Sequence, residues 1–298
     1  MTSNNIKLKA QANNYPSWQL TDRQICDLEL ILNGGFYPLN EFLSKDDYDS
    51  VVNEMRLKNG ALWPLPITLD VDDDFVVKIS NESKITLRDK EGFAIAILTI
   101  SDIWKPDLNH EAKSVFGTLD IKHPGANYVL NIGNNNYIGG KLEMISLPHH
   151  HDYQSLRHSP DDLKKLFKLN KWGKIIAFQT RNPLHRAHFE LTKNAMNELD
   201  ANLLIHPVVG MTKPGDVNHF TRTRCYQHIM KEYKENSAVL SLLPLAMRMG
   251  GPKETLLHAI IRKNYGCTHL IVGRDHAGPG LDSKNNPFYG PYDSQDIM

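Results

Sequence analysis

Residues 174–188 read KIIAFQTRNPLHRAH, and the pattern of this segment indicates how the second half of the chain folds. It begins with an apolar, β-branched run that is typical of a buried strand, and from residue 187 to residue 199 it continues as a helical pattern. The other strands of this half are predicted at 202–206, 238–243 and 269–273, and the other helices at 220–235 and 252–265. Strands that alternate with helices in this way predict a parallel sheet with right-handed crossovers.

Four unusual loops directly follow the predicted strands. They cover residues 179–188, 207–216, 245–252 and 273–280. The carboxyl ends of parallel strands meet at one edge of a sheet, and ligands of such sheets bind outside that edge. We therefore expect the four loops to form one ligand-binding rim.

The first loop carries two histidines, His185 and His188, at a strand-to-helix turn. Their spacing places both on one face of the helix, near the N-terminal N–H groups that attract anions. The same spacing occurs in zinc sites, but the neighbouring Gln179, Arg181 and Asn182 are not the carboxylate or thiolate ligands that favour zinc. Such donors suit nucleotidyl transfer, in which charge develops on phosphate oxygens. Neither a Walker A loop nor a GxGxxG fingerprint is present.

The last loop reads GRDHAGPG over residues 273–280. Its small residues allow the backbone to approach a ligand closely, and a tight turn alone does not explain the charged triplet at its centre. We expect a ligand contact in this loop. Arg248, in the preceding loop, is a candidate for an additional anion contact, with an ordinary surface arginine as the alternative.

The first half of the chain has the pattern of a β-rich domain with flanking helices. Helices are predicted at 21–32 and 44–55, and strands at 67–71, 75–79, 84–87, 93–100 and 141–145. The prolines and clustered histidines of residues 147–160 predict a linker, which gives domains of 1–152 and 153–298. The triplet His149, His150 and His151 could suggest a metal site, but adjacent histidines on an extended chain point to alternate sides, which favours a plain linker.

Composition excludes several classes of protein. Lys and Arg together number 34, as do Asp and Glu, so no bulk charge draws the chain to nucleic acid or to an anionic membrane. The three cysteines lack the spacing of a disulfide framework or of a zinc site. Residues 1–14 lack the apolar core of a signal peptide, and no window reaches a membrane-spanning length. We expect a cytoplasmic protein with no nucleic-acid or membrane partner and no dedicated metal site.

Four motifs together resemble the ATP sulfurylase (sulfate adenylyltransferase) family: QTRNPLHRAH, HPVVGMTKPGD, LPLAMRMGGPKE and IVGRDHAGPG. The N-terminal stretches LELILNGGFYPLNEFL and ITLDV are similar to the same family. The resemblance implies a PUA-like β-rich domain followed by a Rossmann-like α/β nucleotidyltransferase domain of the HxxH type. It also implies an enzyme of sulfate assimilation that joins sulfate to the AMP part of ATP, giving adenosine 5′-phosphosulfate and pyrophosphate.

The resemblance also implies the roles of individual residues. Thr180, Arg181 and Asn182 would form the catalytic set, and His185 and His188 would stabilise the transition state. Sulfate would be held by Gln179, Arg181 and Ala277. ATP would be held by Gln179, Thr180, Arg181, Asn182, Gly273, Arg274, Asp275 and His276. Sulfate is fully ionised at neutral pH, so direct in-line attack on the α-phosphorus needs no general base, and Mg²⁺ would arrive with ATP.

Two other functions compete with this interpretation. Another HxxH adenylyltransferase, acting on a phosphorylated cofactor precursor, would need a larger organic pocket. The PUA-like domain raises the alternative of a non-catalytic RNA- or nucleotide-binding module, which the zero net charge disfavours. We further expect a homo-oligomer, with a fused or separate adenylylsulfate kinase as a candidate partner.

Members of the family continue well past the position of Met298 with further catalytic-domain sequence. Residues 293–296 resemble a helix start with Asp293 at its cap. We therefore expect a catalytic domain truncated at its C-terminus, and impaired activity and stability for a chain that ends at Met298.

Overall fold

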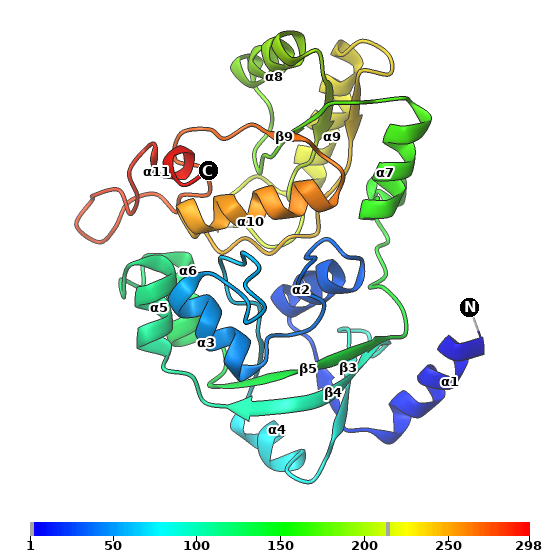
Figure 1. Ribbon diagram of the computed structural model, residues 1–298, viewed down its shortest axis with the longest axis vertical. Helices are drawn as coiled ribbons and strands as arrows, with labels where there is room; N and C mark the ends of the chain where they lie inside the picture. The colour runs from blue at the N-terminus through cyan, green and yellow to red at the C-terminus, as the bar shows by residue number, and fades with distance from the viewer. Residues whose placement is uncertain (1–2, 213–214) are drawn as a thin grey trace.

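The computed structural model describes residues 3–212 and 215–298 of the chain. Two residues of the predicted loop 207–216, Lys213 and Pro214, lie outside the described residues, as do Met1 and Thr2. Figure 1 shows two halves stacked along the long axis, with the N-terminal half below and the C-terminal half above.

The N-terminal half is built on a mixed sheet in the order β1-β3-β4-β5-β2. Its strands are β1 (Ser17–Gln19), β2 (Leu69–Val71), β3 (Lys84–Arg88), β4 (Ala94–Trp104) and β5 (Asn136–Met144). Only β1 and β3 pair in parallel among these strands, and the other neighbours are antiparallel. The sequence located β2, β3, β4 and β5, with β4 and β5 longer than predicted, and it missed the short edge strand β1.

The helices of this half are α1 (Ser3–Gln11), α2 (Asp22–Leu32), α3 (Lys45–Glu54), α4 (Asp73–Lys78), α5 (Leu108–Phe116) and α6 (Pro124–Asn127). The short elements η1 (Ala12–Asn14) and η2 (Tyr128–Ile132) are a 3₁₀ and a π turn. The predicted capping box of α2 is confirmed, because Thr21 and Gln24 bond to each other's backbone N–H.

The strand predicted at 75–79 is wrong, since this segment is the helix α4. The side chain of Asp72 accepts a hydrogen bond from the backbone N–H of Phe75 at 2.7 Å, which caps the helix start. Phe75 is buried, whereas Val77 is 74% exposed. Of these two apolar side chains, only Phe75 is buried. The helix cap at Asp72 outweighs the preference of the valines for a strand.

The C-terminal half contains a parallel sheet in the order β8-β7-β6-β9. Its strands are β6 (Ile175–Phe178), β7 (Asn202–Ile205), β8 (Ala238–Leu240) and β9 (His269–Leu270). The chain adds strands outward from β6 to β8 and then returns to the other side of β6 with β9. This reversal makes the position between β6 and β9 a topological switch point, and ligands of doubly wound sheets bind in the crevice at such a point.

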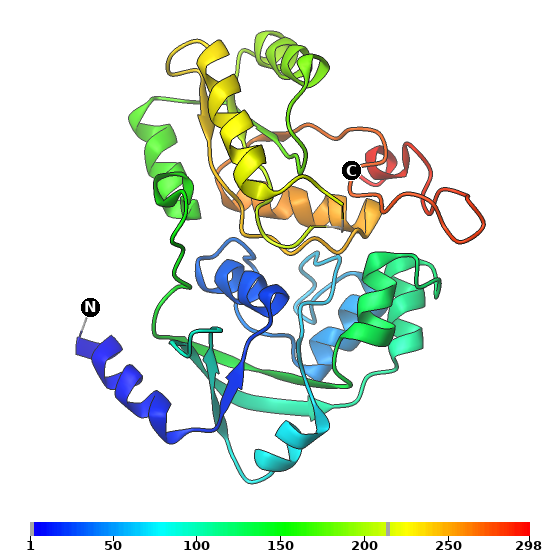
Figure 2. The same cartoon turned by 180° about the vertical axis from the view of Figure 1, so that it is seen from behind.

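Helices cover both faces of this sheet. They are α7 (Pro160–Leu169), α8 (Arg186–Leu199), α9 (His219–Ile229), α10 (Gly251–Asn264) and α11 (Asp293–Asp296), with 3₁₀ turns η3 (Gln154–Leu156) and η4 (Met230–Glu232). Ile176 and Phe178 of β6 belong to the same core cluster as Tyr226 of α9, whereas Ile175 and Ala177 belong to the cluster of α10. Figure 2 shows α9 in front of the sheet, on the opposite side from the viewpoint of Figure 1.

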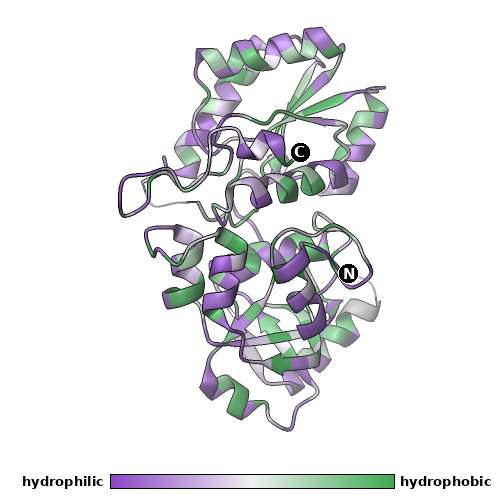
Figure 3. Ribbon diagram, turned by 60° about the vertical axis from the view of Figure 1, so that its left-hand side comes forward, coloured by the Kyte–Doolittle hydropathy of each residue, from purple (hydrophilic) through white to green (hydrophobic). Residues whose placement is uncertain are grey.

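The two halves share one hydrophobic core. A single cluster joins Leu28 of α2 and Ile67 to Leu257 and Ile261 of α10. Strands β6, β7 and β8 of the parallel sheet are predominantly hydrophobic, while the outer helices alternate between hydrophilic and hydrophobic residues (Figure 3). Helix α10 lies directly above α2 where the halves meet (Figures 1 and 2). The contact is therefore a packed interface.

Helix α11 begins differently from the prediction. Its N-cap residue is Tyr292, and the Asp293 carboxylate instead accepts a hydrogen bond from the backbone N–H of Gly290 at 2.7 Å. Ser294 and Gln295 of α11 donate to the backbone carbonyls of His276 and Val272, so the helix is docked on the loop after β9. Among the described residues, no helix is long and apolar enough to cross a membrane.

Candidate active site

The loops after β6 and β9 leave neighbouring parallel strands at the same edge of the sheet, which is the edge that the motif positions predicted. The backbone of the first loop is fixed from α9, because Arg222 donates to the carbonyl of Arg181 at 2.6 Å and Tyr226 donates to the carbonyl of Asn182 at 2.7 Å. Thr180 closes the turn: its hydroxyl donates to the Asn182 carbonyl at 2.8 Å and accepts from the Asn182 N–H at 3.1 Å. The loop is therefore held rigidly before any ligand arrives. Sequence reasoning missed Arg222 and Tyr226, since a buried arginine on a helix resembles a surface residue in sequence.

The two histidines of the HxxH motif lie side by side at the start of α8. His185 is the N-cap residue of α8 and makes no side-chain capping bond. The His185 and His188 rings are 3.9 Å apart between centroids. Burial and the neighbouring His185 lower the pKa of His188, and its Nδ1 is buried without a hydrogen-bond partner among the described residues. An anion at this helix start would meet free backbone N–H groups and two imidazoles.

Arg181 points from the first loop toward the loop after β8. Its Nη1 lies 2.9 Å from the sulfur of Met249, and its Nε lies 3.7 Å from the Asp216 carboxylate. Met249 has a positive φ of 59°, so the backbone is turned sharply at this contact. The distance to Asp216 is beyond a hydrogen bond, which leaves the guanidinium able to exchange its partner for an anionic ligand.

The loop after β9 is tightly folded. Asp275 and Ala277 have positive φ angles of 49° and 57°, and the Ala277 carbonyl accepts a hydrogen bond from the N–H of Gly251 at the start of α10. Gly273, Arg274 and Asp275 are exposed, whereas His276 and Ala277 are partly buried. Gly251 itself has a φ of 51°, and a Cβ there would lie 2.4 Å from the Tyr289 ring, so a side chain is excluded.

Helix α10 contributes two buried titratable side chains beside the loops after β6 and β9, and no sequence pattern indicated either of them. Glu254 and His258 are fully buried and lie one helical turn apart. The Nε2 of His258 is 3.3 Å from the Gln179 amide nitrogen, and its Nδ1 is 3.0 Å from Nε2 of His276. A single imidazole thus contacts both loops of the crevice.

Arg248 occupies a different environment from the anion contact proposed for it. Its side chain is 2% exposed, and Nη2 lies 2.6 Å from the Asp27 carboxylate of α2. Nη1 donates to the Ala246 carbonyl. This guanidinium is already neutralised across the contact between the two halves, where removal from water makes pairing necessary.

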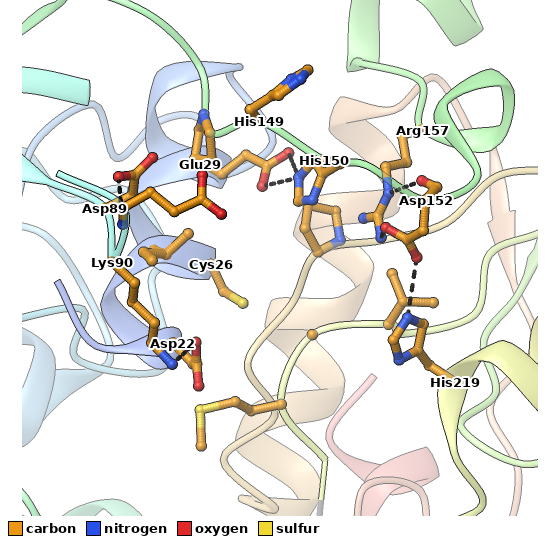
Figure 4. Close-up of a pocket in the computed structure, with 17 residues that line it drawn as sticks. Asp22, Cys26, Glu29, Asp89, Lys90, His149, His150, Asp152, Arg157 and His219 are labelled. Atoms are coloured by element: carbon orange, nitrogen blue, oxygen red, sulfur yellow. Dashed lines mark hydrogen bonds and ion pairs between the residues drawn. The ribbon is translucent and has the colours of Figure 1, made fainter. Parts of the chain in front are cut away.

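A separate cavity of about 420 Å³ lies between α2, the linker and residues 209–211 (Figure 4). Linker histidine His150 lies 2.8 Å from the Glu29 carboxylate of α2, and Asp152 lies 3.1 Å from His219 of α9. The His149 and His151 rings contact each other at 4.6 Å. No group of three or more His, Cys, Asp or Glu side chains is placed to hold a metal ion in the part of the chain that the structure describes.

The chain is similar in sequence to known proteins. Residues 154–298 match the ATP-sulfurylase family model, and residues 2–147 match the model of a PUA-like domain. The sulfate adenylyltransferase of Saccharomyces cerevisiae is 53% identical over 100% of this chain and 58% of its own length. That of Kluyveromyces lactis is 55% identical over 97% of this chain and 57% of its own length.

A solved structure is also similar. The "Hexameric APS kinase from Thiobacillus denitrificans" has a TM-score of 0.78 and 33% sequence identity, over 92% of this chain and 50% of that chain. The chain spans only a little over half the length of the curated relatives named above. Its own two halves are nonetheless both matched, and we conclude that the chain belongs to the ATP sulfurylase family, with a PUA-like domain preceding the ATP-sulfurylase domain.

Proposed function

We propose that this chain provides the site of a sulfate adenylyltransferase, which forms adenosine 5′-phosphosulfate and pyrophosphate from ATP and sulfate. The observation that carries the proposal is the pairing of His185 and His188 at the start of α8, beside the donor-rich loop that follows β6. Relatives that bear the name sulfate adenylyltransferase and match 97% to 100% of the chain support the same activity.

The proposed roles follow from the placement of each group. His185, His188 and the free N–H groups of α8 bind the phosphates, with Thr180 and Asn182 shaping the turn that carries them. Arg181 and Gln179 hold sulfate together with the backbone at Ala277. ATP lies across the crevice between the two loops, against Gly273, Arg274, Asp275 and His276. Arg248, paired with Asp27, positions the loop after β8 and makes no direct anion contact in this proposal.

The reaction in this site is one displacement. A sulfate oxygen forms a bond to the α-phosphorus while the bond from that phosphorus to the bridging oxygen of the β-phosphate breaks, and pyrophosphate leaves with the bonding electrons. The main barrier is the repulsion between two anions, and Arg181 with the imidazoles offsets it by preorganised donors. Sulfate is already deprotonated, so no side chain needs to remove a proton.

Mg²⁺ would enter this site on ATP. The loops offer imidazole, guanidinium, amide and backbone N–H groups, which suit phosphate oxygens, and Mg²⁺ ordinarily keeps water and phosphate ligands. When bound, the ion would neutralise charge on the departing pyrophosphate.

We also propose that the boundary between the two domains lies at residues 152 and 153, and that the protein forms homo-oligomers in the cytoplasm. The similar solved structure from Thiobacillus denitrificans is named as a hexamer, which supports an oligomer here. An adenylylsulfate kinase, fused or separate, would consume the product.

The test is pyrophosphate release by the full-length protein from Mg-ATP, with sulfate present or omitted. We expect release to depend on sulfate, and molybdate to replace sulfate and drive continuous ATP cleavage, because it is a tetrahedral dianion whose mixed anhydride hydrolyses. Phosphate should substitute poorly, since it carries a proton that an all-donor site cannot accept. Equal turnover with phosphate would refute the sulfate assignment, and RNA binding at moderate salt without turnover would favour a non-catalytic module.

A further inference from the structure

The side chains of Glu254 and His258 form a buried pair that has no role in the site as proposed above. The Glu254 carboxylate accepts hydrogen bonds from the backbone N–H groups of Arg248 at 2.8 Å and Gly250 at 3.0 Å. Its Oε1 also lies 3.7 Å from Nε2 of His258. Burial raises the pKa of Glu254, but His258, the Arg248 N–H and the Arg248 guanidinium bring it below its ordinary value, so the carboxylate is ionised.

His258 is a neutral imidazole in this environment. Burial is the main cause that lowers its pKa; Glu254 acts in the opposite direction without reversing the shift, and the charge of Arg262, one turn further along α10, lowers the pKa further. A neutral imidazole carries one N–H proton, on Nδ1 or on Nε2. The protonated nitrogen donates a hydrogen bond and the other accepts one, so the two tautomers exchange these roles. The ionised Glu254 near Nε2 favours the proton on Nε2.

This tautomer conflicts with the orientation of the Gln179 amide. The amide NH₂ of Gln179 faces Nε2 of His258 at 3.3 Å, while its Oε1 is buried without a hydrogen-bond partner among the described residues. The oxygen and nitrogen of a glutamine amide have nearly the same shape and are assigned from their hydrogen bonds. If the Gln179 amide group is rotated by half a turn, Oε1 accepts a hydrogen bond from the Nε2–H of His258. The NH₂ group then occupies the position of the unpaired oxygen.

His276 completes the arrangement. Burial, with His258 and Arg262, lowers the pKa of His276 to about 3, so this imidazole is also neutral. Its Nε2 lies 3.0 Å from Nδ1 of His258 and donates to it when His258 is protonated on Nε2. Both Glu254 oxygens, both His258 ring nitrogens, Gln179 Oε1 and His276 Nε2 then have partners of the complementary kind, as a stable buried polar network requires.

We propose that Glu254 and His258 are positioning residues that fix the His258 proton on Nε2 and thereby make Gln179 present only N–H donors to the anion site. The proposal rests on the proposed function, because Gln179 is taken to contact sulfate. An all-donor site accepts a fully deprotonated oxyanion and disfavours one that retains an O–H group. Glu254 and His258 would therefore set the selectivity for sulfate over hydrogen phosphate without touching either anion.

The first test measures the tautomer directly and needs no activity. Selective ¹⁵N-histidine labelling of the full-length protein, with His258 assigned by comparison with the His258→Gln variant, distinguishes a protonated from an unprotonated ring nitrogen by chemical shift. We expect Nε2 to be protonated and Nδ1 unprotonated. A proton on Nδ1 would overturn the proposal.

The second test compares two substitutions of His258. His258→Gln places an amide N–H near the position of Nε2 and should retain selectivity, whereas His258→Leu removes the donor at similar volume. For His258→Leu we expect the ratio of sulfate to phosphate affinity, from KM and from competitive inhibition by phosphate, to fall roughly tenfold with a smaller change in kcat. Unchanged selectivity in a folded His258→Leu variant, or equal loss in both variants, would overturn the proposal.

The two tests also separate this proposal from the proposed function. If His258→Leu fails to fold, the wild-type tautomer and the selectivity of His258→Gln still decide the matter. If the wild-type protein releases no sulfate-dependent pyrophosphate, the proposed function fails, and with it the assignment of selectivity. The tautomer would then still establish or refute the orientation of Gln179.

Discussion

Two buried polar sites, one around Asp70 in the N-terminal half and one at the rim of the parallel sheet, differ in how far their polar atoms are paired. In the N-terminal half, both Asp70 oxygens are satisfied: Oδ1 accepts from Gln24 at 2.8 Å and Oδ2 accepts from the N–H and the side chain of Asn134 at 2.9 and 3.1 Å. At the rim of the parallel sheet, Gln179 Oε1 and His188 Nδ1 are buried without such partners among the described residues. Buried polar groups are ordinarily paired, so unpaired ones at a crevice indicate where a ligand completes the structure.

The largest expected effect is a loss of stability when the hydrogen bonds of Asp70 are removed. Asp70→Ala should lower the free energy of unfolding by about 3 kcal/mol, because the buried Gln24 amide and the Asn134 N–H lose their acceptor. Chemical denaturation followed by circular dichroism measures this change. Asp74→Ala, an exposed carboxylate nearby, is the matched control and should change stability little. Equal stability of the two variants would show that the Asp70 hydrogen bonds contribute nothing.

The next largest effect is a loss of turnover when the unpaired His188 side chain is removed. His188→Ala should reduce kcat by roughly 10²-fold with a smaller change in ATP affinity, because the imidazole acts mainly on charge that develops during the reaction. The exposed His228 of α9 and His219, which is bonded to Asp152, serve as controls. Steady-state kinetics would contradict the account if His188→Ala kept a normal kcat while either control lost it.

A smaller effect concerns the pH dependence of ATP binding. Burial and His185 lower the pKa of His188 in the free protein, whereas bound phosphate would raise it. ATP affinity should therefore increase as the pH falls through the pKa of the bound state, and should level off below the pKa of the free state, with a slope of at most about tenfold per pH unit. Calorimetry in buffers of different ionisation enthalpy should detect proton uptake, and His188→Asn should abolish that part of it. Uptake that is the same in His188→Asn would place the proton elsewhere.

The sequence predicted the features that depend on local patterns and missed those that depend on contacts between distant residues. The loops after β6 and β9 were located because strand periodicity, the HxxH spacing and the glycine-rich GRDHAGPG loop are local patterns. The helix α4 resembles a strand in sequence because its valines have high β-propensity, whereas its start is capped by one hydrogen bond, which Asp72 Oδ1 accepts from the backbone N–H of Phe75.

The residues that the sequence missed act over long distances in the chain. Glu254 and His258 at helical spacing resemble an ordinary solvated face in sequence. In the structure both are buried, and His258 contacts Gln179, which lies 79 residues away in the chain. Arg248 resembled a free cation because its partner, Asp27, lies 221 residues away in the other half. Pairing of this kind depends on tertiary structure, which no single-sequence pattern contains.

The unpaired polar side chains at the rim, Gln179 and His188, are expected to bind the two parts of a phosphate–sulfate mixed anhydride. The most direct measurement is the reverse reaction: ATP formed by the full-length protein from adenosine 5′-phosphosulfate and pyrophosphate, with each reactant omitted in turn. We predict ATP formation only when both reactants are present, and a loss of rate in His188→Ala that matches its loss in the forward direction. No ATP above the omission controls would contradict the account.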